Sequence, residues 1–198
     1  NNVYPIRSQF VVLACGGIGG LFQNSTNYPH IAGDGLGIAM KHQVKLEHLD
    51  YIQIHPTTLF SHKPGRRFLI SESVRGEGAL LYDKNGQRFT NELQPRDLLS
   101  QAIFEQMEKD GTDFVWEDMC PLGEKTIMQH FPNIYQHCIE EGFDPRKEPI
   151  PVVPAQHYFM GGIQADLSSR TSMRGLYACG ETSCNGVHGK NRLASNSL

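Results

Sequence analysis

The fold class is decided by the stretch Phe10-Val11-Val12-Leu13-Ala14-Cys15-Gly16-Gly17-Ile18-Gly19-Gly20. Its first five residues form a continuous apolar run, which is typical of a strand covered on both faces in a parallel α/β sheet. The glycines that follow permit positive φ angles and let a backbone approach a ligand closely. A second cluster, Gly33-Asp34-Gly35-Leu36-Gly37, precedes a short helical segment. This part of the chain therefore predicts a piece of a nucleotide-binding α/β domain.

The character of the sequence changes near His48 and changes back after Pro154. Short strands are expected at 51–54, 68–70, 79–82 and 87–90, the last two joined by a turn at Asp83-Lys84-Asn85-Gly86. Helices are expected at 96–109, with an apolar face of Leu98, Leu99, Ala102, Ile103 and Met107 and a cap at Gly111, and at 122–141, broken by Pro132 and closed by Gly142. We therefore predict an α+β insertion at 49–159 between two pieces of one α/β domain, 1–48 and 160–198.

Composition excludes several classes of function. The 198 residues carry a net charge of −3 without a basic stripe, so nucleic acid is not expected as a partner. No apolar run approaches the roughly 20 residues that span a bilayer, and no signal peptide opens the chain. The five cysteines form no Cys-x-x-Cys pair, which indicates free thiols in a reducing, cytoplasmic compartment. Nine scattered histidines without a ligand-spaced motif predict no metal site.

The two ends of the chain carry no start or stop signal. It opens at Asn1 without a methionine and stops at Leu198 without a helix cap. Both ends are therefore expected to cut through a larger domain.

Four glycine-containing segments have both a ligand-binding and an ordinary interpretation. Neither early cluster gives Gly-x-Gly-x-x-Gly, because Phe22 and Ile38 stand at the last positions, so alone they favour tight turns. Glu181 ends the apparent strand 176–181, where its carboxylate could accept hydrogen bonds from ribose or ribitol hydroxyls or simply be solvated. The segment 188–198 could open a helix that faces an anion, or be a polar helix cap.

The insertion carries side chains suited to a dicarboxylate, which needs cationic forks and neutral donors. Suitable types in the insertion are Arg96, His55, His157, Thr57 and Ser71, and Arg192 in the piece 160–198 is also suitable. Taken singly, each of these residues is more often structural. Glu72-x-x-Arg75 and Arg75-x-Glu77 have the spacing of plain ion pairs, which contribute under about 1 kcal/mol at a surface.

In combination, these segments resemble the succinate dehydrogenase/fumarate reductase flavoprotein family over nearly the whole chain. The resemblance rests on the glycine clusters, His55-Pro56-Thr57, Ser71-Glu72-Ser73-Val74-Arg75-Gly76-Glu77-Gly78, Pro95-Arg96-Asp97, His157-Tyr158-Phe159-Met160-Gly161-Gly162 and Gly180-Glu181. Within the family, 154–158 and 191–198 are similar to the branch that oxidises L-aspartate. Respiratory members usually carry two glycines where Ala194-Ser195 stand. Ser71 replaces a threonine common in relatives, and Lys190 replaces a small residue.

The resemblance implies the second part of a Rossmann-like FAD-binding domain interrupted by an α+β capping domain. It implies non-covalent FAD and the oxidation of L-aspartate to iminoaspartate, with oxygen or fumarate as electron acceptor. That reaction opens de novo NAD biosynthesis, with quinolinate synthase as the pathway neighbour. The first βαβ unit, with its pyrophosphate-binding glycines, and a helical domain are expected outside this chain.

The resemblance also assigns roles to residues. Arg96 matches the proton donor or acceptor. Substrate-pocket positions match His55, Thr57, Ser71, Glu72, His157 and Arg192, and FAD contacts match Asp34, Glu181, Ser197 and Leu198. Two alternatives stay open: a fumarate reductase or succinate dehydrogenase flavoprotein subunit, and a catalytically incompetent fragment of either type of enzyme.

Overall fold

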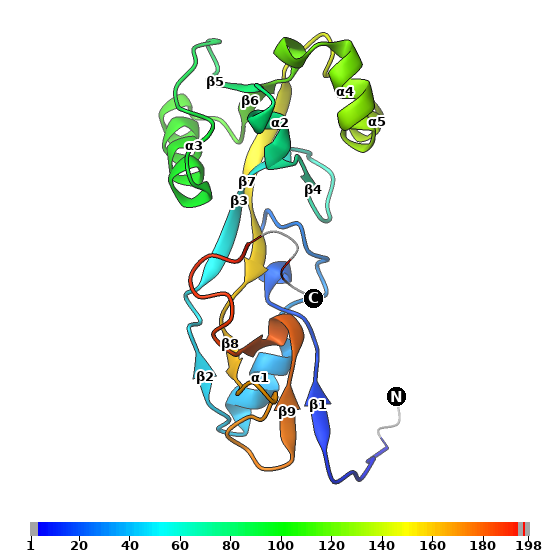
Figure 1. The fold of residues 1–198 in the computed structure, drawn as a ribbon, viewed down its shortest axis with the longest axis vertical. Coiled ribbons are helices and arrows are strands. Elements are labelled where there is room, and N and C mark those ends of the chain that lie inside the picture. The colour runs from blue at the N-terminus through cyan, green and yellow to red at the C-terminus, as the bar shows by residue number, and fades with distance from the viewer. Residues whose placement is uncertain (1–3, 194–195, 197–198) are drawn as a thin grey trace. The chain divides into compact units, whose positions relative to one another are not determined.

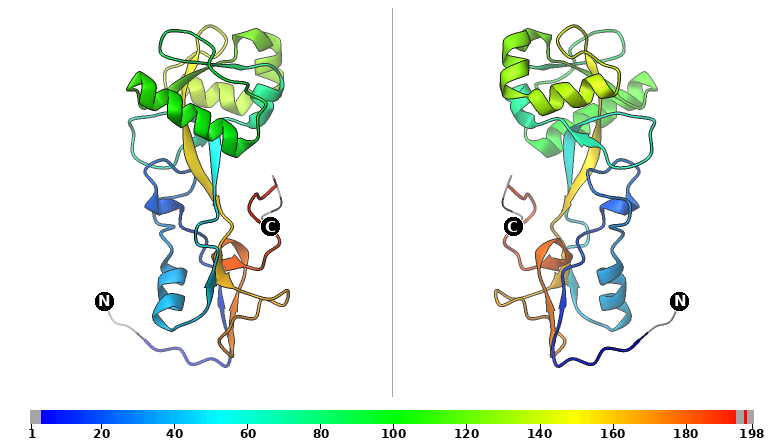
Figure 2. Two further views of the ribbon diagram at one scale, coloured as in Figure 1. Left: turned by 90° about the vertical axis from the view of Figure 1, so that its left-hand side faces the viewer. Right: turned by 90° about the vertical axis from the view of Figure 1, so that its right-hand side faces the viewer.

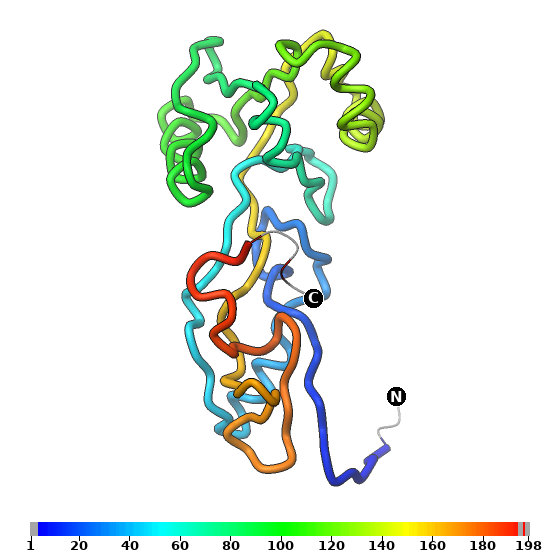
Figure 3. Tube along the Cα trace, in the orientation of Figure 1, coloured from blue at the N-terminus to red at the C-terminus, as the bar shows by residue number. Residues whose placement is uncertain are grey.

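The protein is described by a computed structural model, which places residues 4–193 and 196. The chain divides into two compact units, traced in Figure 3. Unit 1 comprises Asn1–Leu21, Pro29–Gln53 and Tyr158–Leu198, and unit 2 comprises Phe22–Tyr28 and Ile54–His157. The domain boundaries predicted near residues 48 and 159 stay a prediction. The short segment Phe22–Tyr28 shows that unit 2 also draws on residues before the predicted insertion.

Unit 1 contains two small sheets and a helix. The described residues of unit 1 form a parallel pair, β1 (Val11–Leu13) with β9 (Leu176–Ala178), and a sheet of order β10-β8-β2 (Ser183–Cys184, Gly162–Gln164, Leu46–Glu47). Helix α1 (Asp34–Lys41) and two 3-10 turns, η1 (Gly19–Leu21) and η3 (Gly180–Thr182), complete it (Figure 1). Its core consists of Leu36, Ala39, Val44, Phe159, Ile163 and Ala178.

The strand predicted at Phe10–Ala14 forms as β1, but the described residues of this chain do not cover it. Strand β1 is shorter, and Phe10, Val11 and Val12 are 62%, 48% and 60% exposed. Within the described residues, β1 pairs with β9 in a two-stranded sheet. Such a sheet offers too little surface to bury side chains on both faces.

Unit 2 is an α+β unit around a sheet in which the pairs β3–β4, β5–β6 and β6–β7 are antiparallel. Among the described residues the strand order is β4-β3-β7-β6-β5, with bounds Phe68–Leu69, Ile52–Leu59, Ile150–Phe159, Val115–Asp118 and Leu80–Tyr82. Its helices are α2 (Glu72–Gly76), α3 (Arg96–Asp110), α4 (Glu124–His130) and α5 (Pro132–Glu140), with a 3-10 turn η2 (Cys120–Leu122). Helix α3 lies on one side of the strands and the α4–α5 pair on the other (Figure 2). One apolar cluster contains side chains from all these layers, including Val74, Leu81, Leu99, Ile127, Cys138 and Ile150.

Local signals in the sequence explain the helices of unit 2. Helix α3 begins after Pro95 and ends at Gly111, which adopts the left-handed conformation at φ 65°. The predicted helical stretch at 122–141 is two helices, because Pro132 starts α5 where its missing N–H costs nothing. The prediction of Leu98 on the apolar face is wrong: it is 49% exposed, while the neighbouring Leu99 is fully buried. No helix in the described ranges has the length and apolarity to cross a membrane.

Two strand predictions need correction. The strand predicted at 51–54 continues to Leu59, so it carries His55 and Thr57. The segment 87–90 makes only an isolated bridge, Tyr82 to Arg88, and not a strand. The turn itself forms as expected, with the Asp83 N–H donating to the Gln87 carbonyl at 2.9 Å.

Candidate active site

Strand β3 places two predicted substrate residues on one face of unit 2. His55 and Thr57 are two positions apart, so their side chains point the same way, and both are buried. The Thr57 hydroxyl donates to the Ile70 carbonyl at 3.2 Å and accepts from the guanidinium of Arg75. Arg75 is itself 5% exposed, and its Nε donates to the Glu92 carbonyl at 3.3 Å. Burial lowers the pKa of this guanidinium.

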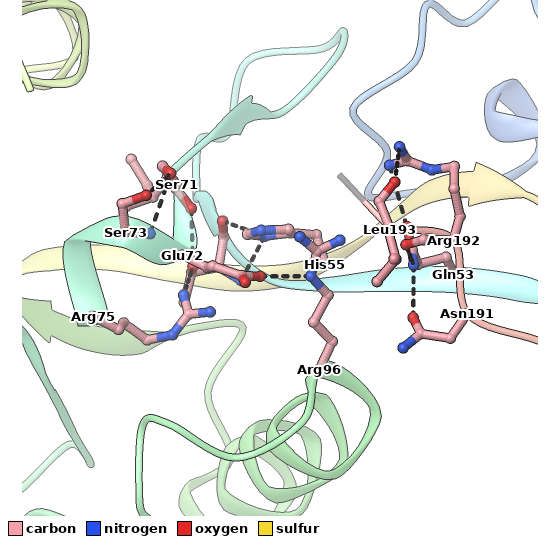
Figure 4. A network of polar contacts seen from close by, with 12 residues as sticks. Gln53, His55, Ser71, Glu72, Ser73, Arg75, Arg96, Asn191, Arg192 and Leu193 are labelled. Atoms are coloured by element: carbon pink, nitrogen blue, oxygen red, sulfur yellow. Dashed lines mark hydrogen bonds and ion pairs between the residues drawn. The ribbon is translucent and has the colours of Figure 1, made fainter. Parts of the chain in front are cut away.

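The predicted catalytic arginine is held by the predicted pocket glutamate. Arg96 starts α3, and its Nε lies 2.7 Å from Oε2 of Glu72 in the first turn of α2 (Figure 4). The arginine side chain is 19% exposed and the glutamate 54%. The sequence spacing suggested that Arg75 forms ion pairs with Glu72 and Glu77. In the structure Glu72 instead pairs with Arg96, and Glu77 contacts His130 at 2.8 Å. The reason is that Arg75 turns inward to Thr57 from a helix of five residues.

The two pocket histidines lie edge to face. The rings of His55 and His157 are 5.5 Å apart at 70°. Nδ1 of His55 lies 3.0 Å from the Thr57 carbonyl oxygen and 3.2 Å from the Thr57 nitrogen, so either tautomer finds a backbone partner. Nδ1 of His157 lies 2.8 Å from the Thr26 hydroxyl. Burial, followed by the charges of His157, Arg75 and Arg96, holds the pKa of His55 well below its usual value. His55 is thus a neutral hydrogen-bonding group at neutral pH.

Ser71 has a structural task in α2. It is the N-cap residue, and its Oγ accepts from the Ser73 N–H at 3.2 Å and donates to the Ser73 hydroxyl at 3.2 Å. This contact satisfies one of the helix's unpaired N–H groups. Its predicted contact with substrate stays a prediction beside this capping role.

Arg192 is fixed within unit 1. Its guanidinium lies 4.5 Å from the centre of the Tyr158 ring, and its Nη2 donates to Gln53 Oε1 at 3.3 Å. The amide of Gln53 in turn donates to the Arg192 carbonyl at 2.8 Å and to Asn191 Oδ1 at 2.9 Å (Figure 4). The ring and the amide hold the plane of the guanidinium, which suits it to a bidentate partner.

The predicted FAD residues gather at one edge of the β1–β9 pair. Parallel strands end at the same edge, where Cys15 to Gly17 follow β1 and Glu181 follows β9. A Cβ on Gly17 would lie 2.5 Å from Oε1 of Glu181, so a larger residue there would require the Glu181 side chain to move. A Cβ on Gly35 would lie 3.1 Å from the Cys15 sulfur, so the start of α1, with exposed Asp34, lies at the same edge.

Polar atoms at this edge fit a cofactor with many hydrogen-bonding groups. Glu181 accepts from the Phe159 N–H at 2.9 Å, and burial raises its pKa. In the part of the chain that the structure describes, Thr182 Oγ1 lies beside Gly35 at this edge, and both it and Nδ1 of His188, which contacts Tyr158, are buried without a hydrogen-bond partner. Buried polar atoms are rarely left this way, so a polar ligand suits them. Ser197 and Leu198 lie outside the described residues.

The structure assembles these side chains from distant parts of the chain. Within unit 2 it gathers His55, Thr57, Ser71, Glu72, Arg96 and His157, and within unit 1 it places Arg192, Asp34 and Glu181. Sequence reasoning missed Arg75 and Thr26 as partners of these groups. Arg75 stood inside a motif already singled out, but its spacing suggested an ion pair. Nothing in the sequence links Thr26 to His157, because their contact depends on the fold.

The fold and this edge define a dinucleotide-binding protein of the α/β type with an α+β unit inserted in it. A family model described as "FAD binding domain" matches residues 2–198, and the chain belongs to this family. The predicted fold class is thereby confirmed, and FAD is the cofactor of the family.

Two of the similar proteins are L-aspartate oxidases from clostridia. The chain is 57% identical over 194 residues to the L-aspartate oxidase of Clostridium perfringens, covering 98% of this chain and 44% of the relative. It is 50% identical to that of Clostridium acetobutylicum, covering 100% of this chain and 46% of the relative. The chain thus spans about half the length of these relatives.

Solved structures agree on the fold. A mutant of E. coli quinol fumarate reductase FrdA superposes with a TM-score of 0.82 at 39% identity, over 95% of this chain and 36% of that chain. Sdh1 of Mycobacterium smegmatis gives 0.82 at 35% identity, over 96% of this chain and 33% of that chain.

Proposed function

We propose that the whole protein containing this chain oxidises L-aspartate to iminoaspartate with non-covalently bound FAD, using oxygen or fumarate as electron acceptor. In this proposal the reaction is the first step of de novo NAD biosynthesis in the cytoplasm, and quinolinate synthase consumes its product. The observation that carries the proposal is the presence in unit 2 of the Arg96–Glu72 pair and of the buried His55, which contacts the backbone of Thr57. Identities of 50–57% to L-aspartate oxidases support aspartate as the substrate.

The residue types suit a substrate with two carboxylates. Arg192 is a planar guanidinium already oriented by Gln53 and Tyr158, so little entropy is lost when it binds a carboxylate. His55 offers a neutral imidazole at a buried position, beside Thr57, whose hydroxyl would have to exchange its bond to the Ile70 carbonyl to donate to a carboxylate. Neutral donors bind a carboxylate without adding a further buried charge, which would be costly.

Positioning is the main contribution of these side chains to the reaction. FAD, when bound, would supply the acceptor for the hydride on Cα of the substrate. We assign to the arginine and histidine side chains the task of holding both carboxylates so that Cα has one orientation. Arg96, held by Glu72, is assigned the proton that carbon must receive when fumarate is reduced.

A second candidate is a fumarate reductase or succinate dehydrogenase flavoprotein subunit. The TM-score of 0.82 to FrdA favours it, because the same fold serves that chemistry. The identity of 39% to FrdA is lower than the 57% to the clostridial oxidase.

The fate of the amino group of L-aspartate distinguishes the two candidate functions. Full-length protein saturated with FAD is incubated with L-aspartate and oxygen, and oxaloacetate and ammonia are measured after the imine hydrolyses. Equal amounts of both products are expected. Flavin-saturated protein that reduces fumarate but releases no ammonia from aspartate would replace the proposal with the second candidate.

A further inference from the structure

Three potential metal ligands from distant parts of the sequence meet in unit 1. Glu47, His48 and Cys184 each offer one ligand atom, and these atoms all lie within 4.8 Å of one another. None belongs to the groups assigned to substrate or FAD. Sequence spacing predicted no metal site, because metal motifs place ligands a few residues apart and these come from two ends of the chain.

The central strand of the small sheet brings the ligands together. Strand β8 lies between β2 and β10, with Glu47 opposite Gly162 and Cys184 opposite Gln164. Two glycines allow the flanking backbones to come this close. A Cβ on Gly161 would lie 2.0 Å from the His48 carbonyl oxygen, and a Cβ on Gly162 would lie 2.5 Å from that of Thr182. Larger residues at 161 and 162 would force the strands apart.

Neighbouring groups orient two of the three ligands. The Gln164 amide donates to Oε1 of Glu47 at 2.7 Å. The His48 ring stacks on Tyr51 with centroids 4.3 Å apart and planes within 8°. The backbone of His48 is left-handed at φ 51°, which is uncommon for a residue with a side chain. Supporting contacts of this kind are what hold metal ligands in place.

We propose that Glu47, His48 and Cys184 form a binding site for a divalent transition metal of the zinc type. Sulfur, imidazole and carboxylate together are donors that zinc accepts, and three protein ligands leave a fourth position for water. In a tetrahedral zinc site, ligand atoms lie roughly 3.3–3.8 Å apart, given bonds of about 2.0–2.3 Å. Ligand atoms up to 4.8 Å apart reach these separations when side-chain rotations move them by on the order of 1 Å.

The burial of the three residues suits entry of an ion from solvent. His48 is exposed, Glu47 is half-buried and Cys184 is 3% exposed, so the set runs from the surface inward. On binding, the Cys184 thiol gives its proton to solvent and its sulfur bonds the metal as thiolate. The bound ion would tie β2 to β10 across β8.

Cobalt is the probe that tests the site. Full-length, FAD-loaded protein is stripped with a chelator and titrated with Co²⁺, whose intense d–d bands in a tetrahedral thiolate site lie to the red of flavin absorption. We expect bands that saturate at one Co²⁺ per chain and that Zn²⁺ abolishes. Cys184→Ser should remove them. His48→Asn, chosen because asparagine tolerates the left-handed backbone, should weaken Co²⁺ binding at least tenfold.

The matched control is Cys120→Ser, a half-buried cysteine of unit 2, which should keep the full signal. Flavin content and far-ultraviolet circular dichroism, measured for each variant, report folding. The proposal is overturned if wild-type protein develops no tetrahedral bands. It is also overturned if the bands persist in folded Cys184→Ser, or if His48→Asn binds Co²⁺ as tightly as wild type.

Discussion

The buried charge of Arg75 fixes the positions of the polar groups around it. Its guanidinium is 5% exposed and contacts two neutral oxygens, the Thr57 hydroxyl and the Glu92 carbonyl. The carboxylate that most offsets the effect of burial on its pKa is Glu117, which is fully buried on β6. Thr57 is thus anchored by a charged group from another element, and its position depends on α2.

Arg96→Leu should lower kcat in the full-length enzyme. If Arg96 supplies the proton to carbon, kcat for fumarate reduction should fall on the order of 10²–10⁴-fold, with a smaller effect on KM. Steady-state kinetics in both directions, at equal flavin content, measures this. Arg174→Leu, an exposed arginine outside the predicted site, is the control. Unchanged fumarate turnover by Arg96→Leu would leave Arg96 as the ion-pair partner of Glu72 alone.

Arg192→Leu should act on binding. A hydrogen bond to a charged group contributes about 1.5–3 kcal/mol, which corresponds to a ten- to hundredfold change or more. KM for aspartate should carry most of this loss if the contact forms already in the ground state. Arg192→Lys keeps the charge but loses the planar fork, so it should recover only part of the affinity. A Leu variant with wild-type KM would exclude the carboxylate contact.

Glu117 should make stability depend on pH. Among the described residues neither carboxylate oxygen has a hydrogen-bond partner, and burial raises the pKa from an ordinary 4.5 to about 7. The folded state therefore holds the proton more tightly than the unfolded state. Stability is unaffected below pH 4.5, falls as the pH rises from 4.5 to 7, and stays lower above that. The full loss is about 3 kcal/mol.

Glu117→Gln removes this ionisation. The variant should lose less unfolding free energy than wild type between pH 5 and pH 8, measured by denaturant unfolding of the full-length protein at both values. Glu105→Gln, on the exposed face of α3, should behave as wild type. Identical pH dependence in Glu117→Gln and wild type would show that Glu117 is already compensated in the folded protein.

At the scale of elements, α3 shows how a helix buries only part of its apolar sequence. Leu99→Ala removes a fully buried side chain from the core of unit 2 and should destabilise by about 2–5 kcal/mol. The adjacent Leu98→Ala should cost little, because Leu98 is 49% exposed. Denaturant unfolding of both variants gives a matched comparison. Equal losses of unfolding free energy in the two variants would indicate that Leu98 packs against residues outside this chain.

At the scale of the whole molecule, we expect cofactor binding to need more than the edge of the β1–β9 pair. Neither glycine cluster supplies Gly-x-Gly-x-x-Gly, which positions a pyrophosphate at a helix N-terminus. We therefore expect the isolated 198-residue chain to retain FAD substoichiometrically or not at all, and the full-length protein to retain it. Flavin absorbance after gel filtration of both proteins decides this. Stoichiometric FAD on the isolated chain would show that Asp34, Glu181 and their neighbours suffice.

The sequence by itself determined what depends on local stereochemistry. Gly111 and Pro132 mark helix ends correctly, because a left-handed cap and a missing N–H act on the chain wherever they occur. The combination of motifs along the chain, among them those carrying Arg96 and Glu181, indicated the family, which the family model over residues 2–198 confirms. The same local reasoning failed for Phe10–Ala14, because strand burial is decided by neighbours and not by the strand.

Only the tertiary structure decided which of these residues meet. Glu72 has the spacing to pair with Arg75, yet it contacts Arg96, because α2 directs Arg75 inward to Thr57. The contact of His157 with Thr26, and the proximity of Cys184 to Glu47 and His48, join segments far apart in the chain. Such contacts are fixed by strand register and by glycines that let backbones approach, so they follow from the packing of the whole unit and not from any local pattern.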